Sequence, residues 1–348
     1  MELQENVLLA PLTTLGVGGN AKFLVRARSQ SDVEEAVAFA QAKRLRLFVL
    51  GGGSNLVISD AGWDGLVVQI GISGIEERRE QGMVLLDVGA GVDWDSFVAH
   101  CVSRNYAGVE CLSGIPGSVG GTPVQNVGAY GQEVSETIVS VLAFDLATNA
   151  VRELSPEECG FSYRSSIFNT KQRERHIILR VSYRLVPEGP PSLRYADLQK
   201  YFAGRDGSPT LAQTSDAVRS IRASKGMLIT PGDPDSRSAG SFFKNPVLSA
   251  SQHEELEQRA AERTLQIPRY PALSQQRKVS AAWLVENSGF KRGYTKGPAA
   301  ISSKHALAIV NRGGATAAAI LALSSEIQNR VEQRWGLRLE PEPVFVGF

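Results

Sequence analysis

Two glycine-rich stretches of this sequence could hold an anionic group through the main chain alone. Residues 51–55 read GGGSN, and residues 114–131 read GIPGSVGGTPVQNVGAYG, with six glycines in eighteen positions and no charged side chain. Because glycine has no Cβ and accepts positive φ, successive amides can approach a phosphate closely. The chemistry indicated is the binding of a phosphate or pyrophosphate by amides and hydroxyls. Tight turns are the competing interpretation of both stretches.

The common motifs do not account for these glycines. Leu56 stands where G-x-G-x-x-G requires its third glycine, and a strand-like segment follows instead of a helix. Pro116 excludes a G-x-S-x-G nucleophile elbow at Ser118, and no P-loop is present. The four histidines are scattered, and Glu257 replaces the second histidine of a zinc helix starting at His253. We therefore expect no metal site.

Six ordered motifs resemble a known family. LGGGSNLVISD (50–60), VGAG (88–91) and SGIPGSVGGTPVQNVGAYGQE (113–133) resemble the flavin-binding module of vanillyl-alcohol-oxidase type. Together with SYRSSIF, AGSFFKNP and LEPE further along, they are similar to the UDP-N-acetylenolpyruvoylglucosamine reductase (MurB) family, in its larger, type I form. The resemblance runs from about Thr13 to Val346, nearly the whole chain.

The resemblance implies FAD as the cofactor, with its pyrophosphate between the two glycine-rich stretches. The bare backbone of these stretches would then let the chain wrap closely around the dinucleotide. The residues that match the cofactor site are Gly51, Gly52, Gly53, Ser54, Asn55, Pro116, Gly117, Ser118, Gly120, Gly121, Asn126, Gly128, Ala129 and Tyr130.

The resemblance also implies a reaction and three catalytic residues. NADPH reduces the flavin, and flavin N5 then passes hydride to the enolpyruvyl methylene of the UDP-N-acetylglucosamine ether, giving UDP-N-acetylmuramate for peptidoglycan. Arg164 would hold the substrate carboxylate through its fork of donors, and Glu342 would stabilise the enol form. Ser241 would donate the proton. Taken alone, Arg164 also fits a surface ion pair, Glu342 a solvated carboxylate and Ser241 a turn.

Substrate contacts are implied at Tyr195, Lys225 and Asn245. A packed tyrosine, a solvated lysine and a turn asparagine remain the alternatives. The sequence departs from the family pattern at Thr295 and Ser302, and its loop before the proton donor is longer. The detailed contacts around these departures stay open.

The elements that must position these residues alternate between strands and helices. Residues 21–27 predict a strand, and residues 47–50 predict a second strand. Between them, Ser31 and Glu34 form a capping box that predicts the start of a helix. Together these elements predict a parallel β-α-β unit. Further strands are expected between residues 66 and 186. Helices are expected near 93–104, 155–160, from Thr214 or Ser215 to about 224, 251–263, 280–289 and 315–335, with strands at 306–311 and at the C-terminus.

These elements predict an α+β fold, a PCMH-type FAD-binding module of two subdomains followed by a substrate-binding domain. The boundaries expected are 1–65, 66–200 and 201–336, with the terminal strand at 337–348 packing back toward the flavin domains. The composition is that of an ordinary globular protein and leaves room for a local pocket that binds a phosphorylated small molecule. With 37 basic and 36 acidic residues, the formal charge of +1 argues against a nucleic-acid partner.

Membrane insertion is not expected, because no segment approaches the roughly 20 apolar residues that cross a bilayer. The first residues lack the positive charge of a secretory signal, and three widely spaced cysteines indicate reduced thiols. We therefore expect a cytoplasmic protein, most simply a monomer. Two rival functions remain: a flavin oxidase or dehydrogenase acting on a hydroxy acid or alcohol, and a non-enzymatic UDP-sugar-binding protein. The choice between NADPH and NADH, the oligomeric state and regulation also stay open.

Overall fold

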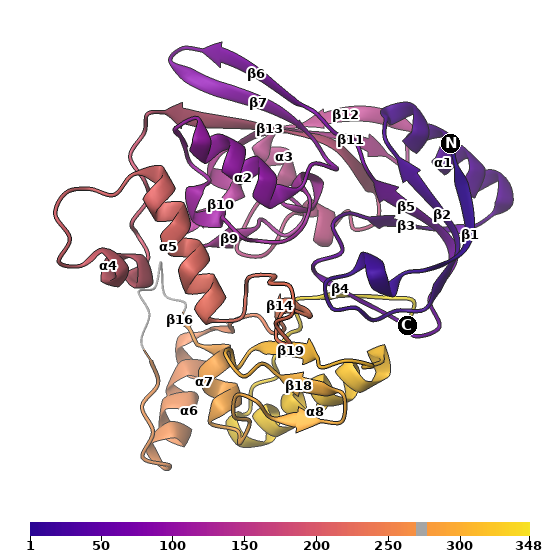
Figure 1. Ribbon diagram of the computed structural model, residues 1–348. Coiled ribbons are helices and arrows are strands. Elements are labelled where there is room, and N and C mark those ends of the chain that lie inside the picture. Colours follow the sequence, from indigo (N-terminus) through magenta and orange to yellow (C-terminus); the bar gives the residue numbers. More distant parts are fainter. Residues whose placement is uncertain (269–276) are drawn as a thin grey trace. The chain divides into compact units, whose positions relative to one another are not determined.

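The computed structural model describes residues 1–268 and 277–348 (Figure 1). Its mixture of helices and sheets confirms the predicted α+β class. By compactness the chain divides into two units. Unit 1 comprises Met1–Val7, Ala21–Gly53 and Trp63–Ser224, and unit 2 comprises Leu8–Asn20, Ser54–Gly62 and Lys225–Phe348. The division into three domains stays a prediction.

The first sheet of unit 1 contains the predicted β-α-β unit. Its strand order is β1 (Leu3–Leu8), β2 (Asn20–Ala27), β5 (Trp63–Ile70) and β3 (Arg46–Leu50), with β2 and β3 both parallel to β5. Helix α1 (Gln30–Lys43) buries a stripe at helical spacing, Val33, Ala36, Val37 and Ala40.

The predicted start of α1 was wrong by two residues. The N-cap is Ser29 and not Ser31, because the Ser29 hydroxyl accepts a hydrogen bond from the Asp32 amide at 3.1 Å. Both serines fit a capping pattern, and the turn that forms uses the first.

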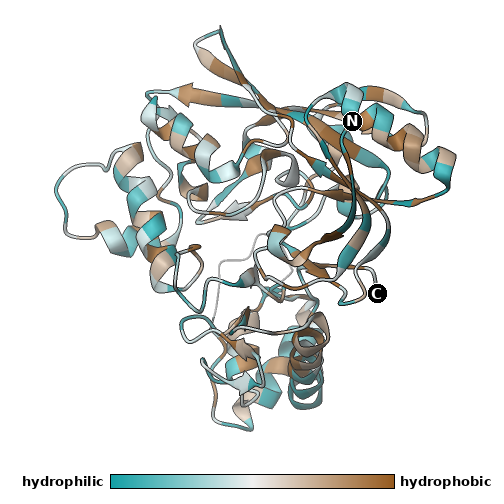
Figure 2. Ribbon diagram, turned by 45° about the vertical axis from the view of Figure 1, so that its right-hand side comes forward, coloured by the Kyte–Doolittle hydropathy of each residue, from teal (hydrophilic) through white to brown (hydrophobic). Residues whose placement is uncertain are grey.

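The second sheet of unit 1 is antiparallel and six-stranded. Its order is β12 (Ala150–Leu154), β11 (Ile138–Asp145), β13 (His176–Pro187), β7 (Met83–Gly89) and β6 (Ile75–Glu80), with β8 (Tyr106–Ala107) pairing to β13. Its central strands contribute buried apolar residues, which appear as brown segments of the ribbon in Figure 2. Tyr183 of β13 packs against Phe97 of α2 (Trp94–Ser103) with ring centroids 4.9 Å apart.

The remaining helices of unit 1 are short except for one. They are α3 (Pro156–Cys159), α4 (Ala196–Phe202), α5 (Leu211–Ser224) and the 3₁₀ turns η2 (Glu110–Leu112), η3 (Val119–Gly121), η4 (Val134–Glu136) and η5 (Ile167–Asn169). Helix α5 begins earlier than the predicted Thr214 or Ser215. Thr210 and Gln213 explain this start, because each side chain accepts from the other residue's amide, at 3.1 and 2.9 Å.

Unit 2 has its own sheet and its own core. The sheet order is β14 (Ser238–Ser241), β19 (Ala308–Asn311), β18 (Ala299–Ile301) and β17 (Thr295–Lys296). Smaller pairs are β15 (Val247–Leu248) with β16 (Arg277–Lys278), and β20 (Val344–Val346) parallel to β4 (Leu56–Ile58). Turn η1 (Ala10–Leu12) and helices α6 (Ala250–Ala261), α7 (Ala281–Glu286) and α8 (Ala317–Trp335) complete it.

Helix α8 shows why the alanine-rich C-terminal region folds as it does. It buries one stripe of large side chains, Ile320, Leu323, Ile327, Val331 and Trp335, while its Thr316 hydroxyl accepts from the Ala319 amide. Gly336 ends it at φ +71°. Strand β20 then returns the C-terminus to β4, the strand that directly follows the first glycine-rich stretch.

Candidate active site

The first residues of the first glycine-rich stretch, 51–53, belong to unit 1 and lie beside the second stretch. A Cβ atom at Gly52 would lie 2.6 Å from both Cα and C of Gly117 and 2.8 Å from the Ser118 amide nitrogen. A Cβ at Gly51 would lie 2.8 Å from the Ser118 hydroxyl. At Gly52 only glycine permits this backbone contact, and at Gly51 a larger residue would crowd the Ser118 hydroxyl.

The second stretch is held against the end of β7 and the start of α2. The Val119 amide donates to the Val92 carbonyl at 2.9 Å, and the Gly120 amide donates to the Ala90 carbonyl at 2.8 Å. A Cβ at Gly120 would lie 2.6 Å from the Ala90 Cβ. Because β7 and α2 belong to the unit's core, the glycine backbone is fixed by rigid elements.

Hydrogen-bond donors near this contact suit an anion. The Ser118 hydroxyl is buried and has no hydrogen-bond partner among the described residues. No backbone carbonyl within the described ranges accepts a hydrogen bond from the Gly52 or Gly53 amide. Buried polar groups are normally paired, so these donors fit a ligand's phosphate oxygens. The chain's own residues here are compatible with the pyrophosphate of FAD.

The end of the second stretch forms a small hairpin, β9 (Gly128–Ala129) with β10 (Gln132–Glu133). Asn126 holds it in place. Its side-chain amide donates to Glu133 at 2.7 Å and to the Ser162 carbonyl at 3.1 Å, and its oxygen accepts from the Ser135 amide. Asn126, predicted in the cofactor site, therefore braces the hairpin through its side chain.

Arg164 lies against the same hairpin. Its Nη2 donates to the Gly128 carbonyl at 2.8 Å, and its own carbonyl accepts from the Asn169 side chain at 3.1 Å. Arg164 has φ +54°, and Asn126 and Tyr130 also have positive φ, at +44° and +49°. Such backbone costs on the order of 1–3 kcal/mol per residue and collects at functional sites. Three predicted site residues thus share a strained local backbone.

One cation of this region was missed from the sequence. Arg222, on α5, donates through Nε to the Gly114 carbonyl at 3.1 Å and is hydrogen-bonded to Tyr130. Burial lowers the pKa of its guanidinium. The Gly114 amide donates to Asp95 at 2.6 Å, and Asp95 pairs with Arg219. The glycine stretch, which has no charge of its own, therefore begins beside two arginines of α5.

The sequence spacing of Arg219 and Arg222 could have indicated a basic face on this helix. Arg219 and Arg222 are three residues apart and so share one face of a helix. Nothing local to the sequence indicates which segment that face meets.

Tyr195 lies at the N-terminus of α4. Its ring makes an edge contact with Tyr130, with centroids 5.4 Å apart, and 42% of its surface is exposed. The contact brings a predicted substrate residue against a predicted cofactor residue.

Ser241 and Glu342 are brought together in unit 2. Ser241 ends β14, and the next residue, Phe242, accepts at its carbonyl from the Glu342 amide at 2.9 Å. Phe243 and Pro341 form an antiparallel bridge one step along. In this register Glu342 lies opposite Phe242, the residue that follows the serine. Two catalytic residues predicted from separate motifs thus belong to one backbone ladder.

The first glycine-rich stretch contributes to that ladder through its last residues. The Asn55 side chain donates to the Glu342 carbonyl at 3.2 Å, and the Asn55 carbonyl accepts from the Val344 amide at 2.9 Å. Thr14 bridges two neighbours by donating to the carbonyls of Ser54 and Ser238, at 3.3 and 2.7 Å. Ser54 and Asn55 therefore help to place the strand that carries the glutamate.

Lys225 belongs to a basic cluster in unit 2. Burial, with the charges of Lys225 and Arg292, lowers the pKa of His305 to about 4, so its imidazole is neutral at pH 7. The His305 Nδ1 accepts from the Leu307 amide at 3.1 Å. Two cations around a neutral histidine form a suitable environment for a phosphate group.

The other substrate positions have structural contacts. The Asn245 side-chain oxygen accepts from the Ala281 amide at 2.9 Å and so caps the start of α7. Ser302, where the sequence departs from the family pattern, is fully buried and accepts from the Lys304 and His305 amides. A role for Asn245 in substrate binding stays a prediction.

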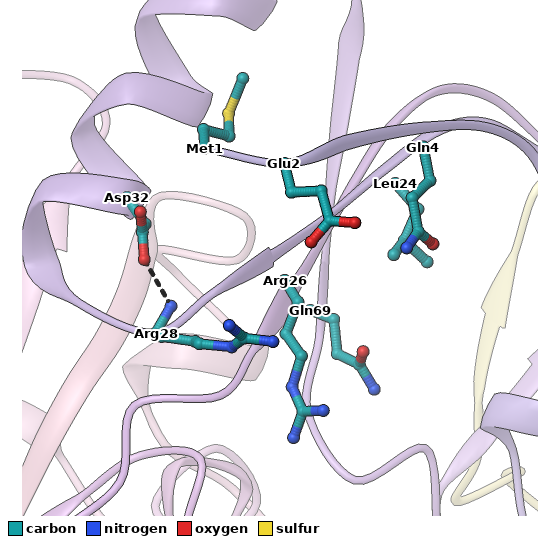
Figure 3. Close-up of a pocket in the computed structure, with 8 residues that line it drawn as sticks. All are labelled: Met1, Glu2, Gln4, Leu24, Arg26, Arg28, Asp32 and Gln69. Carbon is teal, nitrogen blue, oxygen red and sulfur yellow. Dashed lines mark hydrogen bonds between the residues drawn. The ribbon is translucent and has the colours of Figure 1, made fainter.

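A separate pocket of about 400 Å³ lies on unit 1 near the N-terminus (Figure 3). Arg26 and Arg28 line it together with Glu2 and Asp32, and Asp32 accepts from the Arg28 amide at 2.8 Å. The lining contains none of the predicted site residues and mixes both charges. We assign it no part in the site.

Further features of the part of the chain that the structure describes concern metal ligands, membrane-spanning helices and cysteine reactivity. Across residues 1–268 and 277–348, no group of three or more histidine, cysteine or acidic residues could hold a metal ion. Within the same ranges, no helix combines the length and apolar character needed to cross a membrane. All three cysteines are free and buried, and burial raises the pKa of each thiol, that of Cys159 to about 12.

Comparison with known proteins gives the same family over the whole chain. The family model "FAD binding domain" matches residues 21–155, and "UDP-N-acetylenolpyruvoylglucosamine reductase, C-terminal domain" matches residues 233–346. The UDP-N-acetylenolpyruvoylglucosamine reductase of Thermobifida fusca is 46% identical, covering 98% of this chain and 97% of that protein. The enzyme of the same name from Salinispora arenicola is 45% identical, covering 97% and 94%.

A solved structure agrees with this assignment. The crystal structure of UDP-N-acetylenolpyruvylglucosamine reductase (MurB) from Thermus caldophilus has a TM-score of 0.67 and 26% identity, covering 99% of both chains. The resemblance and the FAD-binding module predicted from the motifs are thereby confirmed. The chain belongs to the UDP-N-acetylenolpyruvoylglucosamine reductase family, the FAD-dependent oxidoreductases of peptidoglycan synthesis.

Proposed function

We propose that this enzyme reduces UDP-N-acetylglucosamine enolpyruvate to UDP-N-acetylmuramate, with NADPH as the co-substrate. The observation that carries the proposal is the adjacency of Ser241 and Glu342 on one backbone ladder, in a chain whose relatives bear the name of this reductase. Neighbouring backbone positions that carry a hydroxyl and a carboxyl group suit the protonation of an enol-like carbon.

The cofactor site uses neutral donors supplemented by one cation. The amides of Gly52 and Gly53 and the Ser118 hydroxyl bind the pyrophosphate, and Arg222 adds positive charge at the start of the second stretch. When bound and reduced by NADPH, FAD would supply the hydride for the enolpyruvyl methylene carbon. The close contact between Gly52 and Gly117 keeps these donors in a fixed arrangement.

Side chains of the protein stabilise the negative charge that develops on the substrate and supply the proton. The guanidinium of Arg164 binds the substrate carboxylate, where negative charge collects after hydride addition. Glu342 stabilises the enol form, and the Ser241 hydroxyl donates its proton to the carbon beside the carboxylate. A serine hydroxyl is a weak acid. The carbanion-like intermediate is a strong base, so transfer is efficient if the backbone holds the hydroxyl in place.

The remaining residues recognise the sugar nucleotide. Lys225 and Arg292, the two cations around His305, bind the diphosphate, and Tyr195 covers the uridine end. Asn245 contacts the sugar with the amide nitrogen that its capping contact leaves available. We further propose that the enzyme acts as a monomer in the cytoplasm.

The test is a direct assay of the purified holoenzyme. NADPH loss is followed with UDP-N-acetylglucosamine enolpyruvate and in its absence. We expect loss that depends on the sugar nucleotide and yields UDP-N-acetylmuramate in equal amount. NADPH loss that needs only oxygen favours the oxidase alternative. A preparation that releases no flavin on denaturation favours the binding-protein alternative.

A further inference from the structure

Glu110 is a fully buried carboxylate beside the glycine-rich stretch that begins at residue 114. It lies in η2 of unit 1, and none of its surface is exposed. Its oxygens accept three hydrogen bonds, each 2.8 Å long, from the Gly108 amide, the Gln132 side chain and the Ser192 amide. Burying a carboxylate is costly unless its hydrogen bonds are made, and here they come from three separate segments.

Other buried carboxylates of unit 1 have a different environment. Asp145 is also fully buried, but the Arg175 guanidinium binds both of its oxygens, at 2.9 and 2.7 Å. That arrangement is an ion pair between the last residue of β11 and the residue directly before β13. Glu110 instead connects the turn at residue 108, hairpin strand β10 and the segment that leads into α4.

Two further bonds close this network. The Gln132 side-chain oxygen accepts from the Cys111 amide at 2.8 Å, which orients the donor that Gln132 presents to Glu110. The Cys111 thiol donates to the Ser192 carbonyl at 3.2 Å. The backbone N–H and C=O groups of Ser192 are therefore both held by residues of the same turn, η2.

Segment 192–195 lies directly on the end of the glycine-rich stretch. A Cβ at Gly131 would lie 3.2 Å from the Arg194 Cβ and 3.5 Å from the Tyr195 amide nitrogen. The Tyr195 ring follows and contacts Tyr130. The position of this ring thus depends on how segment 192–195 is fixed to β10 and η2.

We infer that Glu110 is a positioning residue for Tyr195. Its carboxylate fixes Ser192 and Gln132 to one point, and this holds the tyrosine ring over Tyr130 in the place where it contacts the sugar nucleotide. The inference rests on the proposed function, because it takes Tyr195 to be a substrate contact. Glu110 itself touches neither cofactor nor substrate and acts only through the segment it holds.

A carboxylate is required at this position because of its acceptor count. One oxygen of Glu110 accepts from Gln132 and Ser192, and the other accepts from Gly108. Glutamine has the same shape but only one oxygen, so its NH₂ group must face at least one N–H donor. Glu110→Gln therefore loosens the network with no change in side-chain size.

The principal experiment measures two half-reactions of the Glu110→Gln holoenzyme. We expect NADPH to reduce the bound flavin at the wild-type rate when no sugar is present. The KM for UDP-N-acetylglucosamine enolpyruvate should rise about tenfold, a change of about 1.4 kcal/mol, with kcat changed less than twofold. Glu153→Gln, an exposed glutamate of the same unit that pairs with Arg180, is the control and should keep the wild-type KM.

A double-mutant cycle tests whether the effect passes through Tyr195. In the Tyr195→Ala background, Glu110→Gln should add no further increase in KM. A tenfold increase that persists in that background would overturn the inference. So would a wild-type KM for Glu110→Gln alone.

A second pair of variants keeps the inference testable if Glu110→Gln fails to fold. Ser192→Pro removes the amide that donates to Glu110 and leaves the glutamate in place, whereas Ser192→Ala keeps that amide. We expect the proline variant to raise KM for the sugar nucleotide well above the alanine variant. Equal KM values would contradict the inference. If the wild-type enzyme does not turn over the enolpyruvyl sugar at all, the proposed function fails first, and the two failures are thereby distinguished.

Discussion

The contact between the glycine-rich stretches makes a quantitative prediction at Gly52. An alanine there would place its Cβ 2.6 Å from two backbone atoms of Gly117, which cannot rotate away as a side chain could. An ordinary contact of this kind begins at 3.4 Å, so the two stretches must separate by about 0.8 Å. Overpacking of this size costs roughly 1–3 kcal/mol.

If that cost falls on the flavin-bound state, the FAD dissociation constant of Gly52→Ala should rise roughly 5- to 150-fold, since 1.4 kcal/mol is tenfold. Two measurements check this: the flavin released per mole of denatured protein, and fluorescence titration of the flavin-free protein with FAD. The expected outcome is a substoichiometric, weakly binding variant that still folds.

Gly189→Ala is the matched control for this variant. Its Cβ would lie 2.9 Å from the Ala107 Cβ and 3.0 Å from Val186, which is similar crowding in the same unit but outside the glycine-rich stretches. It should lower the melting temperature while keeping a full complement of flavin. Full flavin occupancy with wild-type affinity in Gly52→Ala would refute the argument, as would equal flavin loss in the control.

Two further predictions concern the catalytic and basic groups. The lysine of Arg164→Lys cannot form a two-point contact with a carboxylate, so sugar-dependent turnover should fall about 100-fold. Stopped-flow absorbance should show that NADPH still reduces the flavin of this variant. An unchanged steady-state rate would remove Arg164 from the site. His305 has a folded-state pKa of about 4 against 6.5 when unfolded, so the unfolded chain binds its proton first on acidification. The free energy of unfolding should therefore fall as the pH is lowered from 6.5 to 4, and it should fall less in the His305→Gln variant. An NMR titration that gives His305 of the folded protein a pKa near 6.5 would contradict this.

Local pattern was sufficient to predict the first parallel unit of the fold. The stripe from Val33 to Ala40 predicted the buried face of α1, and the parallel β-α-β unit around it was confirmed. The N-cap was predicted at Ser31 and lies at Ser29, because two serines of the same pattern compete and sequence alone does not rank them. The start of α5 was missed although Thr210 and Gln213 form a recognisable T-x-x-Q capping box.

Long-range contacts account for what the sequence could not predict. Arg222 meets Gly114, and Glu110 meets Ser192, across stretches of chain whose separation is set by tertiary folding. Neither residue belongs to a motif, and each has an unremarkable local sequence. The motifs did predict Ser241 and Glu342, but their adjacency depends on the antiparallel register around Phe243, which no local pattern specifies.

A single-turnover experiment tests the central claim most directly. The holoenzyme is reduced with one equivalent of NADPH without oxygen and then mixed rapidly with UDP-N-acetylglucosamine enolpyruvate. The account predicts that the visible absorbance of oxidised flavin returns with formation of one equivalent of UDP-N-acetylmuramate, and that Ser241→Ala is reduced normally but fails in this second step. Flavin that stays reduced in the presence of the sugar nucleotide, yet is reoxidised rapidly by oxygen, would contradict it.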